Sequence, residues 1–143
     1  MIDNIEDHAV NKVFDLVNVC PEFVDAQTLD IEIFQDLRLA IGEDLVFSDL
    51  VTVYLSSAET LLDSIQTAFT SHDVKAFSLA AHSLKSTSAS IGANRLSQIC
   101  RYFEKNAKTG EITIAPEFLV LLVNEYEAVI NAIQACIITF MSE

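Results

Sequence analysis

Residues that break helices are scarce in this chain, and this scarcity constrains its fold more than any other feature. Only three glycines and two prolines occur among 143 residues. Sheet sandwiches and barrels need many tight turns, and Gly and Pro are the residues that form them. Between the few breakers, apolar residues recur at steps of three and four, which is typical of one face of an amphipathic helix. With 51% hydrophobic residues the chain can bury a core, and we predict an all-α fold.

The breakers divide the chain into six helical segments. We predict helices over residues 4–19 (before Pro21), 29–41 (capped by Thr28, stopped by Gly42), 43–71, 73–91 (capped by Asp73, ended by Gly92), 94–107 (capped by Asn94, closed by Gly110) and 116–140 (from Pro116). The last four are long and joined by short turns, which predicts an antiparallel up-down four-helix bundle with additional short N-terminal helices. The alternating EITIA stretch at 111–115 is too short to indicate a strand. We therefore divide the chain into an N-terminal helical extension, 1–27, and a four-helix-bundle domain, 28–143.

Charge is unevenly distributed along the chain. The net charge is −13, which disfavours nucleic acid and anionic membranes as partners. Residues 75–108 nevertheless hold six of the eight basic residues and one acid, Glu104, so this segment carries +5 and the remainder −18. The cluster is either an ordinary solvated face or a basic patch for an anionic ligand or an acidic partner.

The sequence gives no sign of export or membrane insertion. The N-terminus is acidic and lacks a signal peptide, and no apolar run approaches the roughly 20 residues of a membrane span. Cys20, Cys100 and Cys136 are isolated, which fits reduced thiols better than a disulfide framework. We expect a cytoplasmic protein.

Metal and nucleotide sites are not indicated either. His8, His72 and His82 form no Glu-x-x-His or His-x-x-x-His spacing, so we expect no metal. Because there is also no Gly-rich nucleotide loop or Walker motif, the chain cannot use ATP itself. We expect no cofactor and no kinase activity.

His82 is the residue that stands out. It follows the seam residue Ala81 by one position, about 100° round the helix, and should face outward from the edge of the core. A lone histidine at such an edge is more often structural. The neighbours one or two turns away are mostly small, and a lysine is among them: Ser78, Leu79, Lys85, Ser86 and Ala89. Small neighbours, the lysine and the basic segment favour a functional role.

The predicted helical hairpin supplies a partner for His82. Residues equidistant from its turn, near residue 93, should lie at the same level, which pairs His82 with Glu104 and Lys85 with Arg101. A carboxylate beside Nδ1–H would fix the tautomer that leaves Nε2 as a nucleophile. The alternative is an ordinary surface pair between Glu104 and Lys108.

The segment AHSLKSTSASIGANRL, residues 81–96, resembles the signature of histidine phosphotransfer (HPt) domains of two-component phosphorelays. That signature is a histidine followed by Leu at +2, Lys at +3, usually Gly at +4, and Gly at +10. The corresponding residues here are His82, Leu84, Lys85, Ser86 and Gly92, and the resemblance extends over about 28–137. The departure is Ser86, which is small enough to preserve access and offers a hydroxyl for the phosphoryl group.

The resemblance implies a phosphoryl carrier rather than an enzyme. His82 would accept the phosphoryl group from a receiver-domain aspartyl phosphate and pass it to a response-regulator receiver aspartate. Lys85 would stabilise the phosphoryl group and Glu104 would orient the imidazole. The partner-docking surface is predicted to comprise Ser78, Leu79, Ser86, Ala89, Gly92, Arg95, Arg101 and Lys105.

The partners implied are receiver domains of a hybrid sensor kinase, a response regulator, or both, with Mg²⁺ only in the receiver. We expect a monomer and, since Met1 begins the chain with no kinase core before the bundle, a free-standing HPt protein. Two alternatives are a helical adaptor that docks receivers without transferring phosphate, and a metal- or cofactor-binding bundle. His82 with Lys85 argues against the first, and the missing ligand spacings argue against the second.

Overall fold

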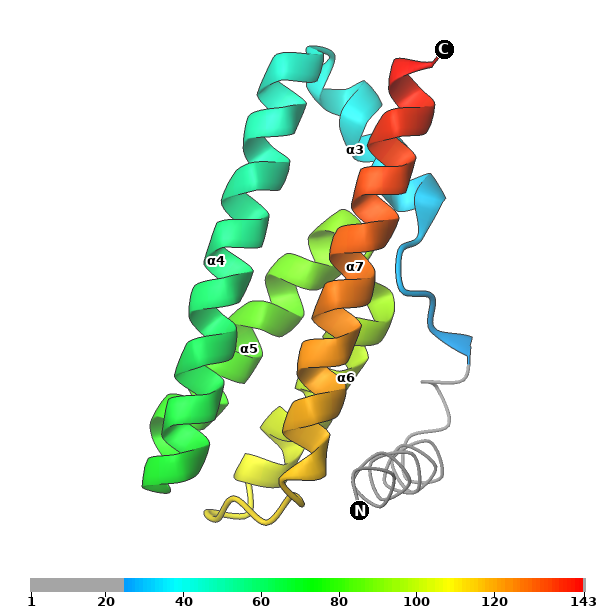
Figure 1. The fold of residues 1–143 in the computed structure, drawn as a ribbon. Coiled ribbons are helices and arrows are strands. Elements are labelled where there is room, and N and C mark those ends of the chain that lie inside the picture. The colour runs from blue at the N-terminus through cyan, green and yellow to red at the C-terminus, as the bar shows by residue number, and fades with distance from the viewer. Residues whose placement is uncertain (1–24, 143) are drawn as a thin grey trace.

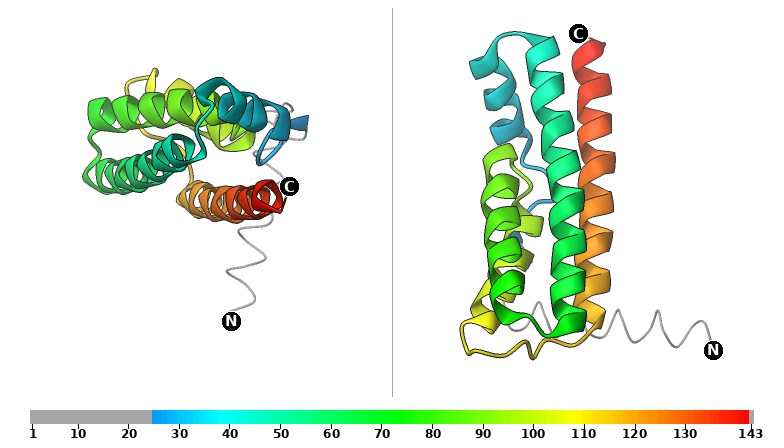
Figure 2. Two further views of the ribbon diagram at one scale, coloured as in Figure 1. Left: turned by 90° about the horizontal axis from the view of Figure 1, so that it is seen from above. Right: turned by 90° about the vertical axis from the view of Figure 1, so that its left-hand side faces the viewer.

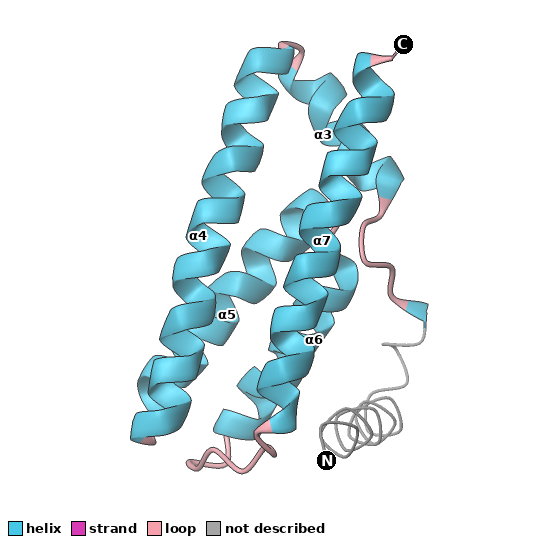
Figure 3. Ribbon diagram, viewed as in Figure 1, coloured by secondary structure: helices cyan, strands magenta, loops and turns pink. Residues whose placement is uncertain are grey.

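The computed structural model describes residues 25–142, and every regular element within that range is a helix (Figures 1 and 3). The helices are α3 (Ile31–Ile41), α4 (Asp44–Ser71), α5 (Val74–Ile91), α6 (Asn94–Ala107) and α7 (Glu117–Met141). The predicted all-α class is confirmed, and residues 111–115 form a loop rather than a strand. The helix predicted over 4–19 and the thiol of Cys20 lie outside the described residues.

Helices α4 to α7 run alternately down and up, as an antiparallel bundle should (Figure 1). They differ in length, since α5 and α6 have 18 and 14 residues while α4 and α7 have 28 and 25. At about 1.5 Å per residue, α4 and α7 extend well beyond the α5–α6 hairpin. Figure 2 shows α3 beside the extended part of α4.

The α3 helix completes the core at this end of the bundle. Its only fully buried residue, Phe34, has its ring 5.1 Å from that of Phe47 on α4 and 6.1 Å from that of Phe140 on α7. Such aromatic contacts add to the burial of the rings themselves. The helix predicted over 29–41 therefore packs over one end of the bundle.

Helix boundaries agree with the sequence where a local signal sets them. Asp73 caps α5 through its carboxylate, which accepts from the amide of Ala76, and Gly92 ends α5 in the left-handed conformation. Two predicted caps are wrong. Asp30, not Thr28, caps α3, and Ala93, not Asn94, occupies the N-cap position of α6 without a side-chain cap.

The reason is a close approach between the start of α3 and the turn between α5 and α6. The Asp30 amide donates to the Gly92 carbonyl at 2.7 Å, and the Arg95 amide donates to the Gln27 carbonyl at 2.9 Å. Residues 26–29 are thus held along α6, and α3 begins only after them. A Cβ atom on Gly92 would lie 2.8 Å from the Asp30 carbonyl oxygen. Glycine is required here both by its φ of +92° and by this contact.

We expect Gly92→Ala to destabilise the fold by about 3 kcal/mol or more, because it combines left-handed backbone strain with a clash against backbone. Gly110→Ala is the matched control. Its φ is +90°, but nothing lies within 4 Å of the added Cβ, so we expect a loss of only about 1 kcal/mol. Urea unfolding followed by circular dichroism measures both. Equal losses would show that the α3 contact does not constrain position 92.

Two of the bundle helices, α4 and α7, are long and apolar enough to cross a membrane by length and composition alone. This measure allows up to two charged residues within its 18-residue window, whereas no uninterrupted apolar run in either helix approaches the length of a span. Core helices of a helical bundle pass the same test, because one face of each is apolar. In α4 the face includes Phe47, Val51 and Ala58, which are buried in the common core.

Candidate functional site around His82

The site consists of three side chains from the α5–α6 hairpin. The Glu104 carboxylate on α6 reaches across to α5 and contacts two residues there. Its Oε2 lies 2.5 Å from His82 Nδ1, and its Oε1 accepts a hydrogen bond of 2.7 Å from Lys85 Nζ. The contact between His82 and Glu104 that the hairpin register predicted is present. One carboxylate thus fixes both the imidazole and the ammonium group.

The three side chains differ sharply in exposure. His82 is 58% exposed, Lys85 27% and Glu104 only 13%. Burial alone would raise the pKa of Glu104, but hydrogen bonds from Lys85 and His82, together with their charges, hold that pKa below its usual value. Glu104 is therefore ionised at neutral pH. It is a shielded anion behind an accessible imidazole.

Because Nδ1 of His82 is bound to Glu104, the nitrogen available for reaction is Nε2. The two ring nitrogens point away from one another, so Nε2 is directed away from Glu104. Because a carboxylate is an acceptor, the Nδ1 atom carries the proton and Nε2 keeps its lone pair in the neutral ring. Nε2 is then a nucleophile on an exposed face of α5.

Packing beneath the site fixes the relative position of α5 and α6. The rings of Phe77 and Phe103, both fully buried, stack with centroids 5.7 Å apart. Two turns before Glu104 on α6, the Ser97 hydroxyl donates to the Lys85 carbonyl at 2.9 Å. On the other side of α5, the hydroxyls of Ser88 and Tyr54 share a buried hydrogen bond of 2.8 Å. The hairpin is thus held on both sides of His82.

Most of the predicted docking residues share the surface around His82. Leu79 is 60% exposed, and Ser78 is half-buried. The remaining exposed members are Ser86, Ala89, Arg101 and Lys105. Leu79 is the one large apolar side chain among them. The surface therefore has mostly small, accessible side chains on α5 and basic side chains on α6.

Gly92 does not belong to this surface, contrary to the prediction, and Arg95 is partly exposed but bound to the segment before α3. Gly92 is buried under the start of α3. Arg95 donates through Nε to the Ala26 carbonyl at 3.1 Å, and its Nη1 lies 3.9 Å from Oε1 of buried Glu125. Burial raises the pKa of Glu125, against a hydrogen bond from Thr28 and the charge of Arg95, which lower it. Both predicted residues are structural, and both secure the segment before α3.

Sequence reasoning missed two features of the structure, of which the first belongs to the site. The first is the ion pair between Lys85 and Glu104. Counting residues from the hairpin turn had placed Lys85 opposite Arg101 instead. The second is a cavity of about 340 Å³ between α3, α4 and α5. Its lining is Leu37, Leu50, Val53, Tyr54, Ser57, Thr87, Ser90 and Ile91. The long-range pairing of α3 and α4 with α5 that creates it leaves no local sequence signal.

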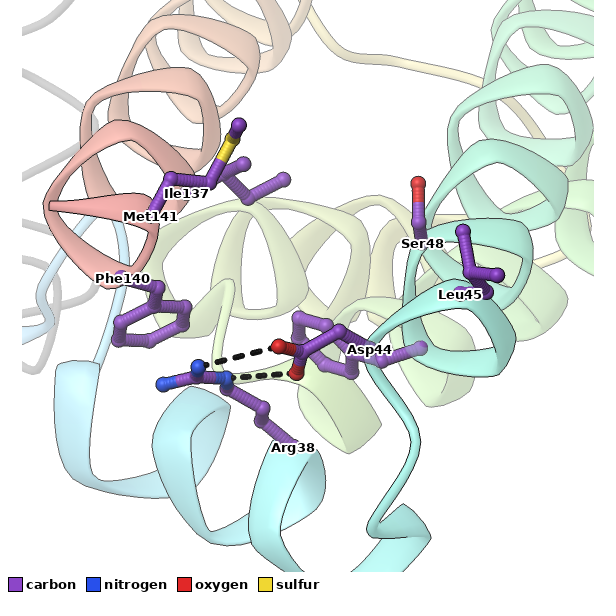
Figure 4. Close-up of a pocket in the computed structure, with 8 residues that line it drawn as sticks. Arg38, Asp44, Leu45, Ser48, Ile137, Phe140 and Met141 are labelled. Atoms are coloured by element: carbon purple, nitrogen blue, oxygen red, sulfur yellow. Dashed lines mark hydrogen bonds and ion pairs between the residues drawn. The ribbon is translucent and has the colours of Figure 1, made fainter. Parts of the chain in front are cut away.

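A cavity of about 360 Å³ lies at the end of the bundle where α3 joins α4 (Figure 4). Apolar residues such as Leu45, Ile137 and Met141 line it, and Arg38 forms a two-bond ion pair with Asp44 at its edge. No histidine or cysteine lines this cavity. Within residues 25–142, no group of three or more His, Cys, Asp or Glu could hold a metal ion. The chemistry available on this part of the chain centres on His82.

The all-helical bundle presents an exposed histidine backed by a partly buried carboxylate, an arrangement that suits a protein that carries phosphoryl groups. The Hpt domain family matches residues 49–132, more than half of the chain. This protein belongs to the Hpt domain family. No curated protein sequence matches it.

Solved structures agree with this assignment. Histidine-containing phosphotransfer protein B from Pseudomonas aeruginosa PAO1 is 28% identical with a TM-score of 0.70, and the match covers 78% of this chain and 96% of that chain. Histidine-containing phosphotransfer protein MtHPt2 from Medicago truncatula is 24% identical with a TM-score of 0.69, covering 97% and 95%. The HPt domain of a sensor hybrid histidine kinase from Shewanella is 20% identical with a TM-score of 0.60, covering 76% and 92%. The last two show the shared fold.

Family membership sets the general function. The protein is a histidine phosphotransfer domain of two-component signalling. Proteins of this family carry phosphoryl groups without kinase machinery of their own, and they interact with receiver domains of hybrid kinases and response regulators.

Proposed function

We propose that His82 accepts a phosphoryl group from an aspartyl phosphate of a receiver domain and passes it to the receiver aspartate of a response regulator. The observation that carries this proposal is that the His82 side chain is exposed and that Glu104 orients its ring. His82 is 58% exposed, and its Nδ1 is bound to Glu104 while Nε2 is left for reaction. A merely structural histidine would not need its reactive nitrogen turned outward.

The proposed step is an in-line displacement at phosphorus. Neutral His82 attacks through Nε2, a P–N bond forms, and the P–O bond to the receiver aspartate breaks. The leaving carboxylate takes the electron pair, and the ring becomes a phosphorylated imidazolium that keeps its proton on Nδ1. The Glu104 carboxylate then stabilises this cation. Transfer to the second receiver is the same step in reverse.

The chain itself supplies no cofactor in this proposal. Receiver domains would bring both the aspartate and the Mg²⁺ that neutralises the phosphoryl oxygens, and Lys85 would add one positive charge from this side. We further propose that the protein acts as a cytoplasmic monomer. Residues 1–27 are a separate N-terminal extension in this proposal, although Ala26 and Gln27 contact Arg95.

Transfer of label from a set of phosphorylated receivers to this protein tests the proposal. Label should appear on the protein with the acid lability and alkaline stability of a phosphohistidine, and it should leave again when an unphosphorylated receiver is added. The alternative, an adaptor that only docks receivers, predicts a stable complex with no label on this chain.

Association with the cognate receiver should depend on salt. Arg101 and Lys105 are exposed beside the site, and the acidic surface around a receiver's phosphoacceptor would attract them. Charges at the rim of an interface act mainly on the association rate, and salt screens them over about 8–10 Å at physiological strength. We expect association to slow as salt rises to several hundred millimolar, with less effect on dissociation.

Neutralising both residues, as Arg101→Gln with Lys105→Gln, should flatten this salt dependence in stopped-flow binding. The control exchanges the two basic residue types, Arg101→Lys with Lys105→Arg, and should keep it because the charge is unchanged. Arg95 is unsuitable for this purpose, since it holds the segment before α3. An association rate indifferent to salt in the unaltered protein would show that the basic segment is only a solvated face.

A further inference from the structure

Six residues of α5 carry a hydroxyl group, and three of these hydroxyls are already engaged. Thr87 and Ser90 donate to the backbone carbonyls of Ser83 and Ser86, one turn back along the helix. Ser88 is buried and bonded to Tyr54. The exposed Ser86 hydroxyl, in contrast, has no hydrogen-bond partner among residues 25–142. It is a free donor on the face that carries His82.

The position of Ser86 places this donor on the same helix face as His82. Residues four apart on a helix lie one above the other on the same face, with Cβ atoms about 6 Å apart. The Cα–Cβ bonds of a helix tilt toward its N-terminus, so the Ser86 side chain leans toward His82. Glu104 occupies the opposite, α6 side of the imidazole. A phosphoryl group on Nε2 would thus stand on the open side of the ring, on the face that Ser86 shares.

Glycine, the usual residue at this point of the motif, has no donor to offer. Lys85, the other donor nearby, is bound to Glu104 at 2.7 Å in the resting protein. The phosphoryl oxygens that share the charge of the transition state would therefore meet the Ser86 hydroxyl as an exposed, unengaged donor one turn beyond His82 on α5. A hydrogen bond placed where charge develops lowers the barrier more than one that is equally strong in the ground state.

We propose that Ser86 is a catalytic residue whose hydroxyl donates a hydrogen bond to an oxygen of the phosphoryl group during its transfer to and from His82. This inference rests on the proposed role of His82. The hydroxyl keeps its own proton throughout, so the bonds that form and break are those already described at Nε2 and phosphorus.

Single-turnover transfer from a saturating phosphorylated receiver tests the role of Ser86. We expect Ser86→Ala to slow transfer roughly 3- to 30-fold, since a neutral donor at an exposed site should contribute less than the 100- to 1000-fold of a buried oxyanion donor. Affinity for the unphosphorylated receiver should fall by a smaller factor than the transfer rate, because Ser86→Ala keeps a small side chain on the docking surface and removes only the hydroxyl that meets the phosphoryl group. Ser86→Thr retains the hydroxyl and should transfer faster than Ser86→Ala.

Ser83→Ala is the matched control. Ser83 is also exposed and its hydroxyl has no partner among the described residues, but it lies about 100° round the helix from His82. Its loss should change transfer less than twofold. If Ser86→Ala behaves like Ser83→Ala, or if Ser86→Gly transfers faster than the unaltered protein, the proposal for Ser86 is wrong while labelling of His82 stands. If no receiver labels the unaltered protein, the proposed function fails and the role of Ser86 fails with it.

Discussion

His82→Gln is expected to abolish phosphoryl acceptance while leaving the helical fold intact. Glutamine cannot form a phosphoramidate at a ring nitrogen, so no residual transfer should remain above background. The fold should tolerate the change because His82 is more than half exposed and contributes nothing to the buried core. We expect the free energy of unfolding to change by no more than about 0.5 kcal/mol. Label transfer measures the first effect, and urea unfolding followed by circular dichroism measures the second.

His72→Gln is the control for this prediction. His72 is exposed and ends α4 with a φ of 57°, away from the Glu104 carboxylate. It should accept no phosphoryl group, so transfer should be unchanged in the variant. Loss of label in His82→Gln together with collapse of the helical signal would instead mean that His82 has a structural role. Retention of label would place the acceptor elsewhere in the chain.

The sequence predicts the long helices well because their signals are local. Steps of three and four between apolar residues depend only on the helix repeat, and Asp73 and Gly92 act on the turns next to them. The start of α3 and the N-cap residue of α6 are predicted less well. They are set by hydrogen bonds from the start of α3 to Gly92 and from Arg95 to Ala26 and Gln27, across more than 60 residues of sequence. No local pattern reveals such a contact.

The same distinction explains what could be foreseen of the site. Counting from the turn of a hairpin gives backbone levels, and it predicts that Glu104 lies opposite His82. It does not give the reach of a side chain. Lys85 lies one turn beyond His82, and its long side chain leans toward the N-terminus of α5. The Lys85 ammonium group therefore contacts Glu104, although the residue at its own level on α6 is Arg101.

Closeness to His82 along the chain does not determine which residues near the end of α5 share its exposed surface. Gly92 and Arg95 follow His82 closely in sequence, but the segment before α3 covers or binds both. Exposure depends on which distant segment packs on a surface. For that reason Ala89, also near the end of α5, remains exposed while Gly92 does not.

Lys85→Ala is expected to slow phosphoryl transfer by roughly 10- to 1000-fold, the loss typical of one charged group that stabilises a transition state. Single-turnover transfer at saturating receiver measures it. The fold should lose only about 1–2 kcal/mol, because Glu104 is left with one hydrogen-bond partner fewer. Lys85→Arg keeps the positive charge and should recover part of the rate. An unchanged rate in Lys85→Ala would remove Lys85 from the site.

The contact between Lys85 and Glu104 leaves two ways for Lys85 to act, and a double-mutant cycle separates them. Glu104→Gln keeps an oxygen that can accept the Nδ1 proton of His82 but removes the charge that pairs with Lys85. If Lys85 acts only by positioning Glu104, then Lys85→Ala should cost nothing further in the Glu104→Gln protein. If its ammonium group moves from Glu104 to the phosphoryl oxygens as transfer begins, Lys85→Ala should cost roughly the same 10- to 1000-fold in either background. We expect the second result, because a phosphoryl group carrying about two negative charges attracts the ammonium more strongly than a single carboxylate does.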